Sequence, residues 1–311
     1  MVEHHGHSHG HAHGRAGHSH AGHGHAPASF GRAFAIGIAL NVAFVVAEMV
    51  VGLAAGSVAL LADAGHNLGD VLGLAVAWGG ATLARAPVSK RFTYGLRGST
   101  ILAALLNALL LLVALGAIAL AAVERFGAPA HVPGLTVSAV AAAGIVVNGL
   151  TAWLFARGRH GDLNTRAAFL HMLSDALVSA GVVVAGVAIW ATHAGWIDPL
   201  TSLVIAALVF WQTWGLLRET VEMALAAVPR GIDYDQVSTT LVALPGVSAA
   251  HDLHIWPMST TETVLTAHLV MPGGVPGDRF LADAKEVLRH RFGIGHATLQ
   301  VETGACGKEC G

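Results

Sequence analysis

Two segments of the chain repeat the same pair of side chains, a histidine and an aspartate, which can bind metal ions. LLADAGHNLGD contains His66 and Asp70, and AAFLHMLSDAL contains His171 and Asp175. Because residues four positions apart share one face of a helix, each segment presents an imidazole and a carboxylate in the same direction. Two such helices facing each other would supply two nitrogen and two oxygen ligands. This donor set suits a tetrahedral divalent ion such as zinc.

The composition indicates that much of the chain lies in lipid. Of the 311 residues, 54% are hydrophobic and 12% are charged, which is about half the charged share of a typical soluble domain. The net charge of −2 argues against a nucleic acid partner, because such a partner requires a strongly basic face. Six apolar stretches approach or exceed the ~20 residues that a helix needs to cross a bilayer. They cover residues 33–54, 57–84, 98–123, 134–156, 167–192 and 199–217.

Both histidine–aspartate pairs fall near the middle of their predicted spans. If the second and fifth spans run antiparallel, His66 lies level with Asp175, and Asp70 lies level with His171. An ionisable residue at the centre of a bilayer costs roughly 3 kcal/mol or more and tends to mark an ion pathway. The four residues are therefore predicted to form a transport site for a divalent metal ion.

Other polar residues in the spans have simpler explanations. Three asparagines are predicted to join helices: Asn41, Asn107 and Asn148. Glu48, near the end of the first span, is expected to be interfacial or a helix partner. Asp63 shares a helix face with His66 and is either a relay on the outer side of the site or a residue facing water at the helix end.

The short loops predict the orientation of the spans. Basic residues collect in two loops, which the positive-inside rule assigns to the cytoplasm; they are Arg85, Lys90, Arg91 and Arg97 between spans two and three, and Arg157, Arg159 and Arg166 between spans four and five. Both termini are then cytoplasmic. The predicted membrane domain covers residues 30–220.

After Pro229 the composition becomes that of a soluble domain. Helical and strand patterns alternate in the order helix, strand, strand, helix, strand. Residues 221–303 are therefore predicted to form a small α+β domain, with helices on one face of a three-stranded sheet. The expected fold class is an α-helical membrane protein with six transmembrane helices and this C-terminal α+β domain.

The two ends of the chain are rich in metal-binding side chains. Ten of the twenty histidines lie in the first 25 residues, so residues 1–29 are predicted to be a disordered cytoplasmic segment that collects metal. The only cysteines, Cys306 and Cys310, lie in the tail over residues 304–311 and exclude a disulfide framework. Their soft sulfur ligands would capture zinc, or the tail is flexible and unliganded.

Charge balance suggests how transport is driven. Two aspartates neutralise one divalent cation, whereas an empty site would hold two uncompensated carboxylates. Metal binding needs deprotonated ligands, so the empty site should return carrying protons, and histidines titrate nearest neutral pH. The hypothesis is metal efflux in exchange for protons.

The sequence resembles the cation diffusion facilitator family, in particular its zinc-transporting members. The resemblance runs from about residue 30 to 303 through the segments AEMVVGLAAGSVALLADAGHNLGDVLGLAVAW, TYGLRGSTILAALLNALLLL, HMLSDALVSAGVVV, DPLTSLVIA, LPGVSAAHDLHIW and HATLQVE. It implies a homodimer in a lipid bilayer, alternating access, proton antiport and a ferredoxin-like, metallochaperone-like cytoplasmic domain that pairs with its twin. It also implies a bacterial cytoplasmic (inner) membrane location and a role in metal homeostasis and resistance. A histidine at position 66 resembles the zinc-preferring members.

The same resemblance implies a second metal site in the cytoplasmic domain. The matching positions are His251, His268 and Glu302, with His254 and Gln300 nearby. The resemblance also implies that zinc bound at this second site has a regulatory role. The segment GGVPGDRFLADA and the loop between spans two and three contain no histidine, so a full two-metal cluster and a loop site are not expected.

Two other classes of function compete with transport. An intramembrane metalloenzyme would also bury histidines and acids, but the chain has no His-Glu-x-x-His run, and a closed four-ligand site leaves no open position for catalysis. A metal sensor or sequestration protein would explain the histidine-rich start and the tail. It would not explain six spans.

Overall fold

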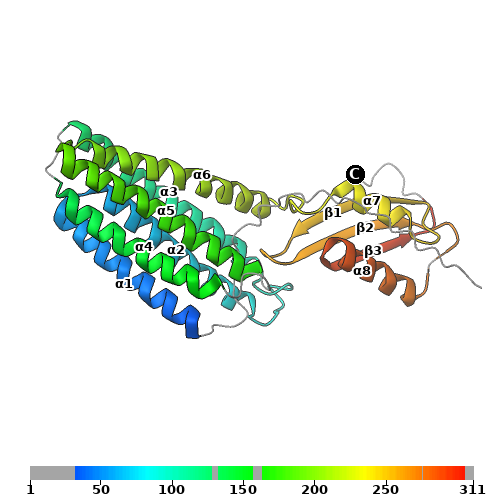
Figure 1. The fold of residues 1–311 in the computed structure, drawn as a ribbon. Coiled ribbons are helices and arrows are strands. Elements are labelled where there is room, and N and C mark those ends of the chain that lie inside the picture. The colour runs from blue at the N-terminus through cyan, green and yellow to red at the C-terminus, as the bar shows by residue number, and fades with distance from the viewer. Residues whose placement is uncertain (1–31, 128–131, 157–162, 275, 305–311) are drawn as a thin grey trace, which may run out of the picture.

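The chain was analysed as a computed structural model, which describes residues 32–127, 132–156, 163–274 and 276–304. Within these residues, six long helices lie side by side in one bundle (Figure 1). They are α1 (Arg32–Ala55), α2 (Val58–Ala84), α3 (Ser99–Gly127), α4 (Gly134–Ala156), α5 (Leu163–Thr192) and α6 (Ile197–Ala224). They correspond to the six predicted spans, and α6 continues past the predicted end at residue 217.

Most helices of the bundle have the length and composition of membrane spans. Among the described residues, four segments are long and apolar enough to cross a bilayer: Ser99–Gly127, Gly134–Trp153, His171–Thr192 and Ile197–Ala224. A shorter apolar segment, Ala39–Ala55, belongs to α1. The remaining helix, α2, carries the polar residues that the sequence singled out.

Helix α2 has two distinct faces. Along one face, small residues let α3 approach closely: a Cβ at Gly69 would lie 2.1 Å from Leu111 Cδ2, and one at Gly73 would lie 2.7 Å from Asn107 Nδ2. Such contacts are a common way for membrane helices to associate. The predicted ligands point toward α5 from the side of α2 that adjoins this glycine face. The close contact with α3 therefore fixes the helix right beside the ligands.

The N-terminus of α2 is capped by an acid from another helix. Asp198, at the start of α6, is fully buried. Its carboxylate accepts hydrogen bonds from the hydroxyl of Ser57 at 2.5 Å, from the backbone N–H of Val58 at 2.7 Å and from that of Ala59 at 3.4 Å. A negative charge at a helix N-terminus satisfies exposed N–H groups and complements the helix dipole.

The C-terminal part is an α+β domain with the predicted order of elements. It consists of α7 (Tyr234–Val242), β1 (Ala249–Pro257), β2 (Thr263–Val270), α8 (Asp278–Phe292) and β3 (Ile294–Glu302). The strands form one sheet in the order β1-β2-β3, antiparallel between β1 and β2 and parallel between β2 and β3. Leu241 of α7 and Leu288 of α8 pack on Leu265 and Leu269 of the sheet. The helices thus cover one face, as predicted.

The α+β domain touches the bundle at the segment between α2 and α3. Arg97 forms an ion pair of 2.5 Å with Glu262 from the turn between β1 and β2. The backbone N–H of Thr260 donates to the Thr100 hydroxyl at 3.1 Å. The loop with the basic residues and the C-terminal domain therefore lie at the same end of the bundle.

Replacing Asp198 with alanine should destabilise the protein. The change leaves the Ser57 hydroxyl and the first N–H groups of α2 without their buried acceptor, which costs about 1–3 kcal/mol. The measurement is the thermal unfolding midpoint of the full chain in detergent, beside Asp283→Ala, which removes an exposed acid from α8. Equal midpoints for the two variants would contradict this role of Asp198.

Candidate metal centres

The four residues of the two histidine–aspartate pairs meet between α2 and α5. Across the helices, His66 Nε2 lies 3.5 Å from Asp175 Oδ1, and His171 Nε2 lies 3.3 Å from Asp70 Oδ2. Within each helix, the corresponding distances are 3.7 Å from His66 Nδ1 to Asp70 Oδ2 and 3.6 Å from His171 Nε2 to Asp175 Oδ2. The crossed contacts have the pairing expected of antiparallel helices.

The spacing of these atoms matches the size of a tetrahedral metal site. Zinc bonds of about 2.0–2.2 Å to nitrogen and oxygen place neighbouring ligand atoms roughly 3.3–3.6 Å apart in a tetrahedron. The four distances run from 3.3 to 3.7 Å. One ligand atom each from His66, Asp70 and Asp175 lies within 4.8 Å of the other two. His66 faces Asp70 with Nδ1 and Asp175 with Nε2, so a rotation of its ring and an approach of His171 would complete a four-ligand site. We call His66, Asp70, His171 and Asp175 the quartet.

Access to the quartet is uneven. The side chains of His66 and Asp175 are 9% and 3% exposed, whereas those of Asp70 and His171 are 32% and 35% exposed. Asp70 lies one turn closer than His66 to the C-terminal end of α2, and His171 lies one turn closer than Asp175 to the N-terminal end of α5. The quartet is thus open on the side of the loop that contacts the α+β domain.

Two further acids are buried beside the quartet. Asp63 is fully buried and accepts a hydrogen bond of 3.0 Å from the Ser179 hydroxyl of α5, so the alternative in which Asp63 faces water is wrong. Glu48 of α1 is also fully buried. The alternative that Glu48 is interfacial is therefore wrong as well, and this acid faces other helices.

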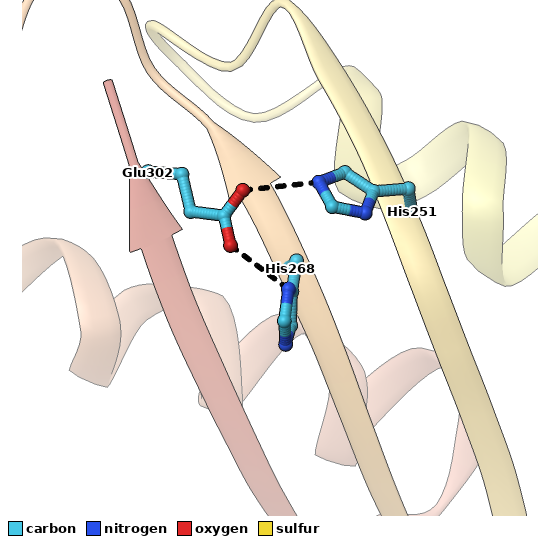
Figure 2. Close-up of side chains that lie close together, drawn as sticks. All are labelled: His251, His268 and Glu302. Atoms are coloured by element: carbon cyan, nitrogen blue, oxygen red, sulfur yellow. Dashed lines mark hydrogen bonds and ion pairs between the residues drawn. The ribbon is translucent and has the colours of Figure 1, made fainter. Parts of the chain in front are cut away.

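A second cluster lies on the sheet of the α+β domain. Figure 2 shows His251 on β1, His268 on β2 and Glu302 on β3 pointing toward one another. Glu302 Oε2 lies 3.2 Å from His251 Nε2, and Glu302 Oε1 lies 2.9 Å from His268 Nδ1. One ligand atom from each of the three residues lies within 4.8 Å of those of the other two. All three side chains are only partly exposed, so the cluster is accessible to an ion.

An irregularity in β1 creates this cluster. His251 pairs with His268, but the next pair is His254 with Thr266, so two residues of β1 stand opposite one residue of β2. Asp252, in this bulge, has a left-handed backbone with φ of 49°, which is uncommon outside glycine. Because a bulge shifts the alternation of side chains by one residue, His251 and His254 share the face of His268 while Leu253 enters the core.

Other polar residues surround the sheet cluster. Asp252 lies 2.9 Å from His254 Nε2 and 3.5 Å from His268 Nε2. Gln300 Nε2 donates to Glu302 Oε1 at 2.9 Å. The sequence had not suggested Asp252, whose only signal is its position between two histidines. The predicted tail ligands Cys306 and Cys310 and the histidine-rich residues 1–29 lie outside the described residues.

A bundle of apolar helices with metal-binding side chains buried at its centre, attached to a small α+β domain, defines a membrane transporter of metal cations. Residues 34–223 match the model of the cation efflux transmembrane domain, and residues 229–304 match that of the cytoplasmic domain of cation efflux proteins. The chain belongs to the cation efflux family, the cation diffusion facilitators, which confirms the resemblance seen in the sequence. It is a transporter for the efflux of divalent metal cations, not an enzyme.

Characterised relatives cover most of the chain. It is 34% identical over 276 residues to the metal cation efflux system protein CzcD of Cupriavidus metallidurans, covering 88% of this chain and 87% of the relative. It is 36% identical to the zinc transporter ZitB of Escherichia coli, covering 86% of each chain. It is 33% identical to the cadmium, cobalt and zinc/H⁺–K⁺ antiporter of Bacillus subtilis, covering 84% of this chain and 86% of the relative.

One solved structure also matches the end of the chain. The metal-bound C-terminal domain of the CzcD transporter from Cupriavidus metallidurans is 36% identical, with a TM-score of 0.22. The match covers 23% of this chain and 99% of that chain.

Replacing His268 with alanine should weaken metal binding by the sheet cluster. Changing a residue that hydrogen-bonds to a metal ligand typically lowers metal affinity roughly 10–100-fold. Loss of the ligand itself should cost at least as much. The measurement is calorimetric titration of the full chain with zinc. The control is His290→Ala on α8, where His290 lies 2.6 Å from Glu286. Hydrogen bonds from Arg289 and His290 lower the pKa of Glu286. His290 thus takes part in an exposed ion pair on α8 that lies apart from the sheet cluster, so its loss should leave zinc binding there unchanged. Equal zinc affinities in both variants would contradict the assignment.

Proposed function

We propose that the chain exports zinc from the cytoplasm in exchange for protons, with the quartet as the transport site. The observation that carries the proposal is the pair of crossed contacts, His66 with Asp175 and Asp70 with His171, at 3.5 and 3.3 Å. They assemble two imidazoles and two carboxylates from two helices. A site shared between two helices can be opened on either side by movement of one helix against the other.

The chemistry of the ligands supports zinc as the cargo. Two nitrogens and two oxygens with tetrahedral spacing are favourable for zinc. The only cysteines of the chain lie in its last residues, so the quartet lacks the soft sulfur ligands that copper(I) prefers. The relative from Escherichia coli is named a zinc transporter, and the one from Bacillus subtilis is named for cadmium, cobalt and zinc. The cargo class is divalent, and zinc is its proposed principal member.

The exposure of the quartet supports loading from the cytoplasm. The more exposed residues, Asp70 and His171, lie toward the end of the bundle that carries Arg85, Lys90 and Arg97. Basic loops face the cytoplasm in membrane proteins. The contact of Arg97 with Glu262 puts the α+β domain on that same side. We therefore assign both termini to the cytoplasm and the protein to the bacterial inner membrane.

Charge compensation supports exchange with protons. A divalent ion bound by two aspartates and two neutral histidines gives a site with no net charge. Without the ion, two carboxylates would carry uncompensated charge in a medium where each charge is costly. Protons on the quartet would restore neutrality during the return step. The Bacillus subtilis relative is named a cadmium, cobalt and zinc/H⁺–K⁺ antiporter.

The α+β domain is proposed to pair two chains and to sense the cargo. Its helices cover one face of the sheet, and the other face carries the cluster of His251, His268 and Glu302. Zinc bound there would make the activity of a homodimer depend on the zinc concentration in the cytoplasm. We assign residues 30–220 to the membrane domain, 221–303 to this domain, 1–29 to a histidine-rich segment that collects metal, and 304–311 to a cysteine-containing tail.

Replacing Asp175 with asparagine should abolish zinc transport. The change removes one of the two charges that neutralise the ion and leaves the size of the side chain unchanged. Zinc flux into proteoliposomes should fall to the level of empty vesicles, while Asp283→Asn, which neutralises an exposed acid, should transport like the unchanged protein. Full flux in Asp175→Asn would overturn the proposed site.

Cell survival in raised zinc separates transport from sequestration. Under the proposal, His66→Ala abolishes resistance, whereas deletion of residues 1–28 weakens it only slightly. Resistance that follows the histidine-rich start and ignores the quartet would favour sequestration instead.

Zinc flux should be accompanied by proton movement in the opposite direction. As zinc enters proteoliposomes, an internal pH dye should report alkalinisation, because each transport cycle carries protons outward. Flux should also rise when the internal pH is lowered. Zinc flux with an unchanged internal pH would exclude proton exchange.

A further inference from the structure

The contacts between α2 and α5 continue past the quartet. Asp70 meets His171 at 3.3 Å, His66 meets Asp175 at 3.5 Å, and Asp63 meets Ser179 at 3.0 Å. Each step moves three or four residues back along α2 and four residues forward along α5, which is one helical turn of about 5.4 Å. The third contact is therefore a further rung of the same ladder, one turn nearer the N-terminus of α2.

A third helix adds an acid to this rung. Glu48 of α1 is fully buried, as is Asp63. Asp63 and Asn67 of α2 interact electrostatically with the Glu48 carboxyl. Among the described residues, neither oxygen of Glu48 has a hydrogen-bond partner, and Oδ1 of Asp63 and Nδ2 of Asn67 also have none. We call Glu48 and Asp63 the outer pair.

The outer pair has an unmet electrostatic requirement. While both are ionised, the two carboxylates are hydrogen-bond acceptors only, so neither satisfies the other unless a proton or a cation lies between them. Burying an unpaired charge among apolar helices costs several kcal/mol. The helix α4, which packs against α1, contains no acidic or basic residue, and His66 and Asp175 are the nearest titratable residues along α2 and α5. A cation between the two carboxylates would supply the missing partner.

We propose that the outer pair is a second binding site for the transported divalent cation, occupied after the ion leaves the quartet. The ligands would be the carboxylates of Glu48 and Asp63, with the Asn67 side-chain oxygen and the Ser179 hydroxyl at its edge. Two carboxylates neutralise a divalent ion, as in the quartet. This inference rests on the proposed function, because the ladder is then the exit path.

The donor set makes the outer pair weaker for zinc than the quartet. It contains oxygen ligands only, whereas imidazole nitrogen favours zinc and its neighbours in the transition series. Oxygen ligands suit manganese, magnesium and calcium. A weaker site one turn beyond a tight one lets the ion move outward in two short steps. It also keeps each step close to neutral in charge.

Manganese binding measures the outer pair separately from the nitrogen-containing sites. The full chain in detergent is first given only as much zinc as its tighter, nitrogen-containing sites take up, so that no free zinc remains to compete for the weaker outer pair. It is then titrated with Mn²⁺ detected by electron paramagnetic resonance. The unchanged protein should bind one more Mn²⁺ per chain than Glu48→Gln or Asp63→Asn. The control Glu124→Gln removes the same charge from an exposed position on α3 and should keep this ion.

Glu48→Asp guards against a folding defect. This variant keeps the charge of the acid, so it should retain the manganese ion with reduced affinity and elute from a sizing column like the unchanged protein. If the unchanged protein and folded Glu48→Gln bind the same number of Mn²⁺ ions per chain, the proposal is overturned. This is the result expected if the outer pair binds protons and no metal ion.

Flux measurements separate this inference from the proposed function. Glu48→Gln should lower the maximal zinc flux and leave the zinc concentration at half-maximal flux unchanged, because exit slows and loading does not. If Glu48→Gln transports and binds manganese normally while Asp175→Asn is inactive, only the outer pair is excluded. If Asp175→Asn transports normally, the proposed function itself fails.

Discussion

The arrangement of the membrane domain depends on the antiparallel register of α2 against α5. Positions four residues apart on each helix meet positions four residues apart on the other, so each histidine faces an aspartate across the interface as well as along its own helix. A shift of one residue along either helix would rotate its ligands by about 100° and separate the pairs. In lipid, unpaired polar groups are expensive. The polar contacts therefore favour one register strongly.

Two contacts of α2 with other helices maintain this register. The glycine face of α2 allows α3 to approach so closely that a methyl group at Gly69 would overlap Leu111. The carboxylate of Asp198 holds the first turn of α2 to the start of α6. One contact limits the rotation of α2 and the other its position along the axis. A transporter must move its helices against one another. Movement of α2 would have to loosen these two contacts or carry α3 and α6 with it.

The α+β domain builds its cluster by a different physical device. Strand alternation would direct His251 and Leu253 to the same face of the sheet, and the core requires Leu253. The bulge at Asp252 separates their directions and brings His251 beside His268. The left-handed backbone at Asp252 costs free energy. This strained residue lies in the bulge that positions the metal-binding cluster. The sheet can thus present three ligands on one face without disturbing the core under α7 and α8.

The sequence by itself determined the composition of the membrane helices, the order of elements in the α+β domain, and the identity of the quartet, because period and spacing along one helix are local properties. His66 and Asp70 share a face whatever surrounds them. Only the tertiary structure decided what lies opposite a side chain. The burial of Glu48, the capping by Asp198 and the bulge that turns His251 toward His268 all depend on which distant segment packs against a given face, and a linear pattern of residues carries no such contact.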